Sequence, residues 1–133
     1  MKHNVTLTIT SLLSIVLFAF HWVDEISRGM ETGRLSGLGG VLILVVRLCG
    51  TLLLAERRSG YIIMLVGGIL GVVVLVLHMS GAGLVGGRIA ANSSGAFFWV
   101  GTLIALGVTS ACSVILSARA LFFFNKARPS LSS

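Results

Sequence analysis

Residues 61–79 read YIIMLVGGILGVVVLVLHM, a segment that is apolar or glycine throughout except for its first residue, Tyr61, and His78 near its end. A helix of about 20 such residues crosses the hydrocarbon core of a bilayer. Three further apolar stretches accompany it, at residues 5–23, 37–55 and 96–124. Because lipid offers no hydrogen bonds to the backbone, stretches of this kind fold as helices. The sequence therefore predicts a single all-α domain, a compact bundle of four transmembrane helices.

The composition agrees with a lipid environment. Hydrophobic residues make up 56% of the chain and charged residues only 11%, compared with about 25% charged residues in a soluble domain. We expect a multi-pass protein of the bacterial inner membrane, with the lipid bilayer as its main surroundings. The net charge of +6 would suggest nucleic acid in a soluble protein. In a membrane protein it reflects loop charge, so no nucleic-acid partner is predicted.

The distribution of basic residues predicts the orientation of the helices. Cytoplasmic loops of membrane proteins carry an excess of Lys and Arg. With both termini inside, the outer loops are residues 24–36 and 80–95, and residues 125–133 form a basic tail. The outer side then carries three basic residues and the inner side six, namely Lys2, Arg57, Arg58, Arg119, Lys126 and Arg128. We therefore expect both termini in the cytoplasm.

Polar side chains gather at the outer ends of two predicted helices. His21 and Glu25 lie four residues apart and so share one helix face, with Asp24 beside them. His78 lies near the end of the stretch 61–79, seven residues after Gly71. Because both helices run outward in this topology, the two histidines are expected at the same membrane boundary.

Three interpretations of this cluster remain open from the sequence. His21, Glu25 and His78 can provide imidazole and carboxylate ligands for a metal ion, or groups for proton transfer. Two histidines on separate helices can also ligate a haem, although nothing in the sequence demands the flat slot that a haem needs. The third interpretation is that these residues, with Trp22, only anchor the helix ends at the headgroups.

Arg47 falls inside the second apolar stretch, where a charge is unfavourable. Insertion scales assign about 2.5–3.5 kcal/mol to an arginine at the centre of a span. We therefore expect Arg47 to form an ion pair with Glu25 or Asp24. The alternatives are that Arg47 binds an anion or a quinone, or that it controls the ionisation of Glu25. Arg88, in the second outer loop, is expected above the same pocket.

Small residues indicate where helices approach one another, since close backbone contact drives association in lipid. Gly67 and Gly71 are spaced for such contact in the third stretch. The fourth stretch carries a similar stripe of small residues, at Gly101, Ala105, Thr109 and Ser113. This stripe either packs inside the bundle or forms a homodimer interface.

The sequence contains no nucleophile–base pair, phosphate loop or cysteine-rich motif, which argues against an enzyme. Our leading hypothesis is a small membrane protein whose outer pocket binds, or transports, a small ion or polar ligand. The expected lining residues are His21, Asp24, Glu25, Arg47, His78 and Arg88. The competing hypotheses are an accessory subunit of a larger membrane complex, without chemistry of its own, and a haem- or quinone-binding electron carrier.

Overall fold

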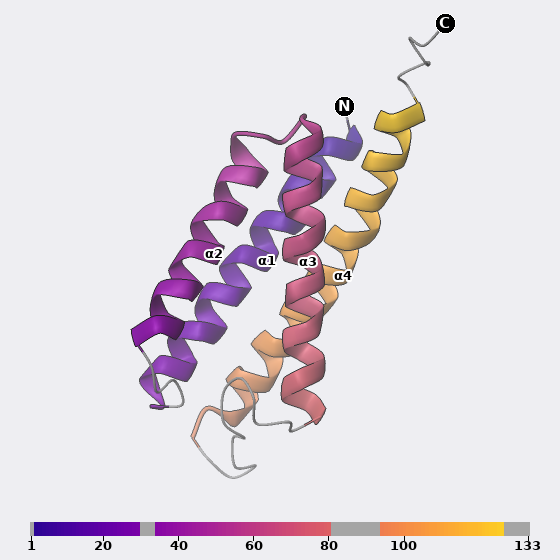
Figure 1. Ribbon diagram of the computed structural model, residues 1–133. Coiled ribbons are helices and arrows are strands. Elements are labelled where there is room, and N and C mark those ends of the chain that lie inside the picture. Colours follow the sequence, from indigo (N-terminus) through magenta and orange to yellow (C-terminus); the bar gives the residue numbers. More distant parts are fainter. Residues whose placement is uncertain (1, 30–33, 81–93, 127–133) are drawn as a thin grey trace, which may run out of the picture.

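The computed structural model describes residues 2–29, 34–80 and 94–126. These residues form helices that run side by side, and no strand occurs among them (Figure 1). The helices are α1 (Lys2–Ser27), α2 (Arg34–Leu52), α3 (Arg58–Ser80) and α4 (Ala96–Lys126). The predicted all-α class is confirmed.

Three of the described helices are long and apolar enough to cross a membrane, at Val5–Ser27, Arg58–Ser80 and Ala96–Lys126. The fourth, α2, has a shorter apolar segment, Gly37–Leu52. Large apolar side chains cover the outside of the bundle, and many of them are more than half exposed, including Ile9, Leu42, Val76 and Val108. This surface is typical of a protein surrounded by lipid, where exposed apolar side chains carry no penalty.

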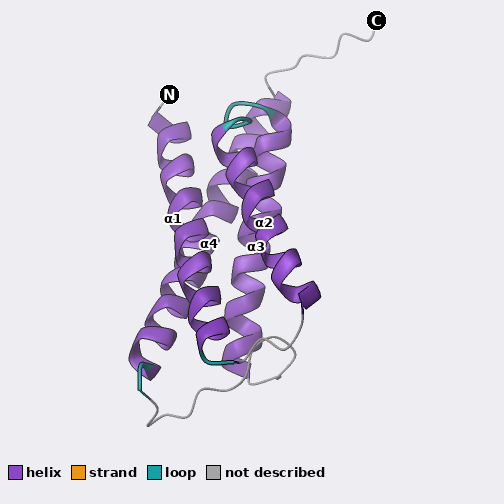
Figure 2. Cartoon of the chain, turned by 90° about the vertical axis from the view of Figure 1, so that its left-hand side faces the viewer, coloured by secondary structure: helices purple, strands orange, loops and turns teal. Residues whose placement is uncertain are grey.

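The chain turns sharply between α2 and α3. Helix α2 ends at Leu52, before the predicted end at residue 55, and α3 begins at Arg58. The turn passes directly over Gly60, where a Cβ atom would collide with the backbone carbonyl of Leu54. Only glycine, which has no Cβ atom, fits at this position. The start of α1 and the end of α4 lie at the same end of the bundle as this turn (Figures 1 and 2).

Glycines bring α3 close to α4. Of the two glycines that the sequence pattern singled out, Gly71 faces Ser110 of α4, whereas Gly67 faces Arg47 of α2. A Cβ atom on Gly68 would lie 2.8 Å from Val114 Cγ2 and 3.0 Å from the Ser110 carbonyl oxygen. On α4 the stripe of small residues winds around the helix. Ser113 is fully buried inside the bundle, whereas a Cβ atom on Gly101 would meet nothing within 4 Å.

The interior of the bundle differs from one end to the other. At the end that carries the α2–α3 turn, an apolar cluster fills the core, formed by Leu7, Tyr61, Met64 and Ala120. Toward the other end, charged and polar side chains are buried beside Trp99, Leu103 and Leu106. They include His21, Glu25 and Arg47, each at most 4% exposed. Because buried polar groups need partners, this half of the bundle is where function is expected.

Candidate metal centre

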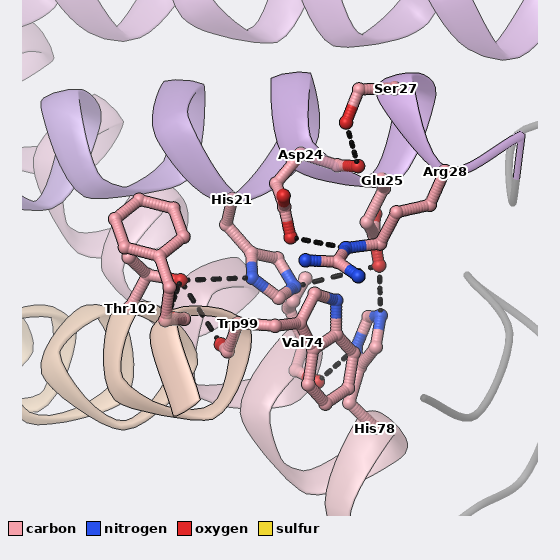
Figure 3. A network of polar contacts seen from close by, with 10 residues as sticks. His21, Asp24, Glu25, Ser27, Arg28, Val74, His78, Trp99 and Thr102 are labelled. Atoms are coloured by element: carbon pink, nitrogen blue, oxygen red, sulfur yellow. Dashed lines mark hydrogen bonds and ion pairs between the residues drawn. The ribbon is translucent and has the colours of Figure 1, made fainter. Parts of the chain in front are cut away.

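Helices α1 and α3 place two histidines and a glutamate in contact (Figure 3). The Glu25 Oε1 atom lies 2.7 Å from His78 Nε2 and 3.5 Å from His21 Nε2. The two imidazole rings meet edge to face, with centroids 5.3 Å apart. The prediction that His21 and His78 converge at one end of the bundle is therefore confirmed. We call His21, Glu25 and His78 the His/Glu cluster.

The other ring nitrogen of each histidine is engaged with an acceptor oxygen. His78 Nδ1 lies 2.7 Å from the Val74 carbonyl oxygen, which can only accept, so Nδ1 carries a proton. His21 Nδ1 lies 3.4 Å from the Thr102 hydroxyl, whose own proton is directed at the Phe98 and Trp99 carbonyl oxygens. Both histidines thus direct Nε2 at Glu25. Metal-binding histidines are oriented in this way, by a hydrogen bond at the nitrogen that does not bind the metal.

Helix α4 closes the cluster with an aromatic wall. The Trp99 ring centroid lies 5.2 Å from that of His21 and 5.5 Å from that of His78. The side chains of His21, His78 and Glu25 are 2%, 1% and 5% exposed, so water is largely excluded. Neither Trp99 nor Thr102 was among the site residues expected from the sequence. Their position near the start of the fourth apolar stretch was a usable signal, but the sequence does not show which way that helix faces.

Asp24 lies at the rim and takes no part in the cluster. Its Oδ2 atom accepts a hydrogen bond of 2.8 Å from Arg28 Nε, and Arg28 Nη1 donates to the Ser94 carbonyl oxygen at 2.8 Å. Arg28 therefore ties the end of α1 to the residues that precede α4. Arg88, which we expected above the pocket, lies outside the described residues.

Arg47 pairs with neither Glu25 nor Asp24, so that expectation is wrong. Its Nη2 group donates to the Ser14 hydroxyl, and Ser14 in turn donates to the Ser11 carbonyl oxygen. Throughout the described ranges, no carboxylate comes within 4.0 Å of Arg47. The physical reason is the depth of Arg47 in the bundle, which is the level of Ser14 and not that of the carboxylates near the end of α1. Ser14 lies seven residues before His21, which is about 10 Å along a helix.

The distances in the His/Glu cluster suit a small ion. One potential ligand atom from each of the three side chains, a ring nitrogen of each histidine and a carboxylate oxygen of Glu25, lies within 4.8 Å of the other two. A tetrahedral zinc ion with bonds of about 2.0–2.1 Å requires ligand atoms about 3.3 Å apart, so these separations would have to change by at most about 1.5 Å to complete the site. A haem does not fit, because its two axial imidazoles must stand on opposite faces of a flat ring. Here the imidazoles touch each other and share one carboxylate oxygen.

Comparison with family models, with curated proteins and with solved structures gives no match to this chain. The function must therefore be inferred from the geometry of the site alone.

Proposed function

We propose that this chain is a multi-pass protein of the bacterial inner membrane that binds one divalent transition-metal ion, of the zinc class, in the His/Glu cluster. In this proposal α2 also crosses the membrane, both termini are cytoplasmic, and the cluster lies at the outer end of the bundle. The supporting observation is the convergence of two imidazole Nε2 atoms on one buried carboxylate oxygen. Two histidines and one glutamate form a common zinc ligand set that leaves a fourth position open.

The hydrogen bonds of His78 indicate what the ion would displace. His78 Nδ1 already holds a proton, so the 2.7 Å contact between Nε2 and Glu25 Oε1 needs a second proton between those two atoms. A metal ion takes the lone pair of Nε2 and therefore releases that proton. Binding is expected to weaken as the pH falls.

The apolar end of the bundle bears on transport. Leu7 and Met64 are each 1% exposed and belong to the apolar cluster that fills the cytoplasmic end in the proposed orientation. An ion at the His/Glu cluster could not cross the bilayer unless this cluster opened. We therefore propose binding as the function of the chain and leave translocation to a conformation with an open inner end.

Calorimetric titration of the full chain with zinc chloride tests the proposal. After purification in a neutral detergent and treatment with a chelator, the protein should bind one ion per chain. The variants His21→Ala, His78→Ala and Glu25→Gln should each weaken binding about a hundredfold or more, since loss of supporting groups alone costs 10–100-fold. Matched controls are His3→Ala and Asp24→Asn, which should bind as the wild type does.

Two results would contradict the proposal. One is an absence of binding by the wild-type chain, and the other is equal binding by the wild type and the three cluster variants. If the chain binds no metal and instead copurifies with a stoichiometric protein from native membranes, the accessory-subunit hypothesis replaces this one.

A further inference from the structure

A cavity of about 270 Å³ lies between α1, α2 and α3. Its outer part reaches the His/Glu cluster and its deep part reaches Arg47. Between these ends the walls are apolar, formed chiefly by Phe18, Trp22, Ile43, Leu70 and Val74. The cavity therefore has an apolar body and one buried cation at its deep end.

The Arg47 side chain at this deep end has no counterion among the residues that the structure describes. Arg47 is 4% exposed, and its one hydrogen bond to a side chain goes to the neutral hydroxyl of Ser14. Its Nε atom is buried and has no partner. A guanidinium has five N–H donors and keeps its charge in proteins. A buried charge is normally paired, and no carboxylate among residues 2–29, 34–80 and 94–126 lies within 4.0 Å of Arg47, so a bound anion is the expected partner.

The surroundings of Arg47 hold the guanidinium in place. Its side chain lies across α3 at Gly67, where an added Cβ atom would fall 2.9 Å from Arg47 Cδ. Because Gly67 has no side chain, the arginine stem can lie flat against α3, and its charge stays at the level of Ser14 rather than reaching the membrane surface. An anion must therefore enter the cavity to meet it.

We propose that this cavity binds a small amphipathic carboxylate, with its anionic head on Arg47 and its apolar body against Phe18, Ile43 and Leu70. An engineered cavity of 150 Å³ holds benzene, so this cavity holds about ten non-hydrogen atoms. That volume is too small for a two-chain phospholipid. Arg47 is suited to the head group because a guanidinium binds a carboxylate through two parallel hydrogen bonds.

The probe for this proposal is cinnamate, which has an apolar body of the required size, and its neutral counterpart is cinnamyl alcohol. Binding of radiolabelled cinnamate is measured on the full chain in phosphatidylcholine nanodiscs, with chelator present so that the metal centre plays no part. The alcohol is measured by competition. A charge-assisted hydrogen bond to the arginine predicts that the carboxylate binds at least about tenfold more tightly than the alcohol.

Two variants locate the binding. Arg47→Met removes the charge at similar side-chain length and should abolish the difference between acid and alcohol. Val74→Phe fills part of the cavity but leaves Arg47 intact, and it should weaken both compounds. The matched control is Arg119→Met, at an exposed position on α4, which should bind as the wild type does.

The wild-type comparison stands even if a variant fails to fold. Equal binding of cinnamate and its alcohol, or no binding of either, overturns the proposal. A final arm repeats the titration in phosphatidylglycerol nanodiscs. If anionic lipid occupies the site, the apparent affinity for cinnamate falls by at least about tenfold, and the small-carboxylate proposal is wrong. If the affinity is unchanged, the cavity prefers the small carboxylate.

Discussion

Replacing Glu25 in the metal-free protein should show how much the His/Glu cluster contributes to stability. Glu25→Leu removes the acceptor that lies 2.7 Å from His78 Nε2. That nitrogen then has no hydrogen-bond partner from residue 25, and it is buried, since the His78 side chain is only 1% exposed. A hydrogen bond to a charged group contributes about 1.5–3 kcal/mol, and an unsatisfied buried donor costs about 1–3 kcal/mol. Because these terms overlap, we expect the free energy of unfolding to fall by about 3 kcal/mol.

A graded series separates this effect from simple loss of charge. Glu25→Gln keeps an acceptor oxygen for His78, so it should lower the free energy of unfolding by only about 1 kcal/mol. Asp24→Asn removes the neighbouring carboxylate, whose partner Arg28 is 20% exposed in its side chain, and should cost about 0.5 kcal/mol. Unfolding in detergent–dodecyl sulfate mixtures with chelator, followed by circular dichroism, measures all three. If Glu25→Leu costs no more than Asp24→Asn, the cluster does not form as described.

Three further predictions concern other parts of the structure and use the same unfolding assay or calorimetry. Arg47→Met should raise the free energy of unfolding by about 1 kcal/mol, since removing an unpaired charge (about 2.5–3.5 kcal/mol) outweighs one lost hydrogen bond (about 1.5–3 kcal/mol). It should also be additive with Glu25→Gln within about 0.5 kcal/mol, whereas strong coupling would show that the two residues interact. Gly68→Ala should lower the free energy of unfolding by about 2 kcal/mol, because the added Cβ atom meets Val114 and the backbone of α4. Gly101→Ala should change the free energy of unfolding by less than about 0.5 kcal/mol, because its added Cβ atom meets nothing within 4 Å. Equal effects of the two variants would contradict the packing of α3 on α4. Zinc titrations at pH 7 in buffers of different ionisation enthalpy should report about one proton released per ion, and no release would contradict the proton between His78 and Glu25.

The fold class could be predicted because it depends on apolar runs of membrane length, which the sequence displays directly. The placement of His21 and His78 at the same end of the bundle could also be predicted, since it requires only that both helices run in the same direction; the contact between the two rings could not. Neither conclusion needs the rotation of a helix about its axis. The early end of α2 was not predicted because residues 53–55 are as apolar as the helix before them, although they lie in the turn that leads to α3.

The errors at the site have a common physical cause. Arg47 was assigned a carboxylate partner by charge complementarity alone, although the partner's depth in the bundle decides whether the two groups can meet. Ser14, a neutral residue on α1, lies at the right level and takes the hydrogen bond instead. Trp99 and Thr102 were missed because their contribution depends on which face α4 presents to α1 and α3. These relations arise from packing between helices, and the sequence of a single helix does not contain them.

X-ray absorption at the zinc edge tests the central claim most directly. The zinc-loaded full chain should show two imidazole ligands and one carboxylate oxygen at about 2.0–2.2 Å, the distances typical of such sites. The outer-shell scattering should drop to one imidazole in the His78→Ala variant. A spectrum without imidazole scattering, or one dominated by sulfur from the exposed thiols of Cys49 and Cys112, would contradict a metal centre in the His/Glu cluster.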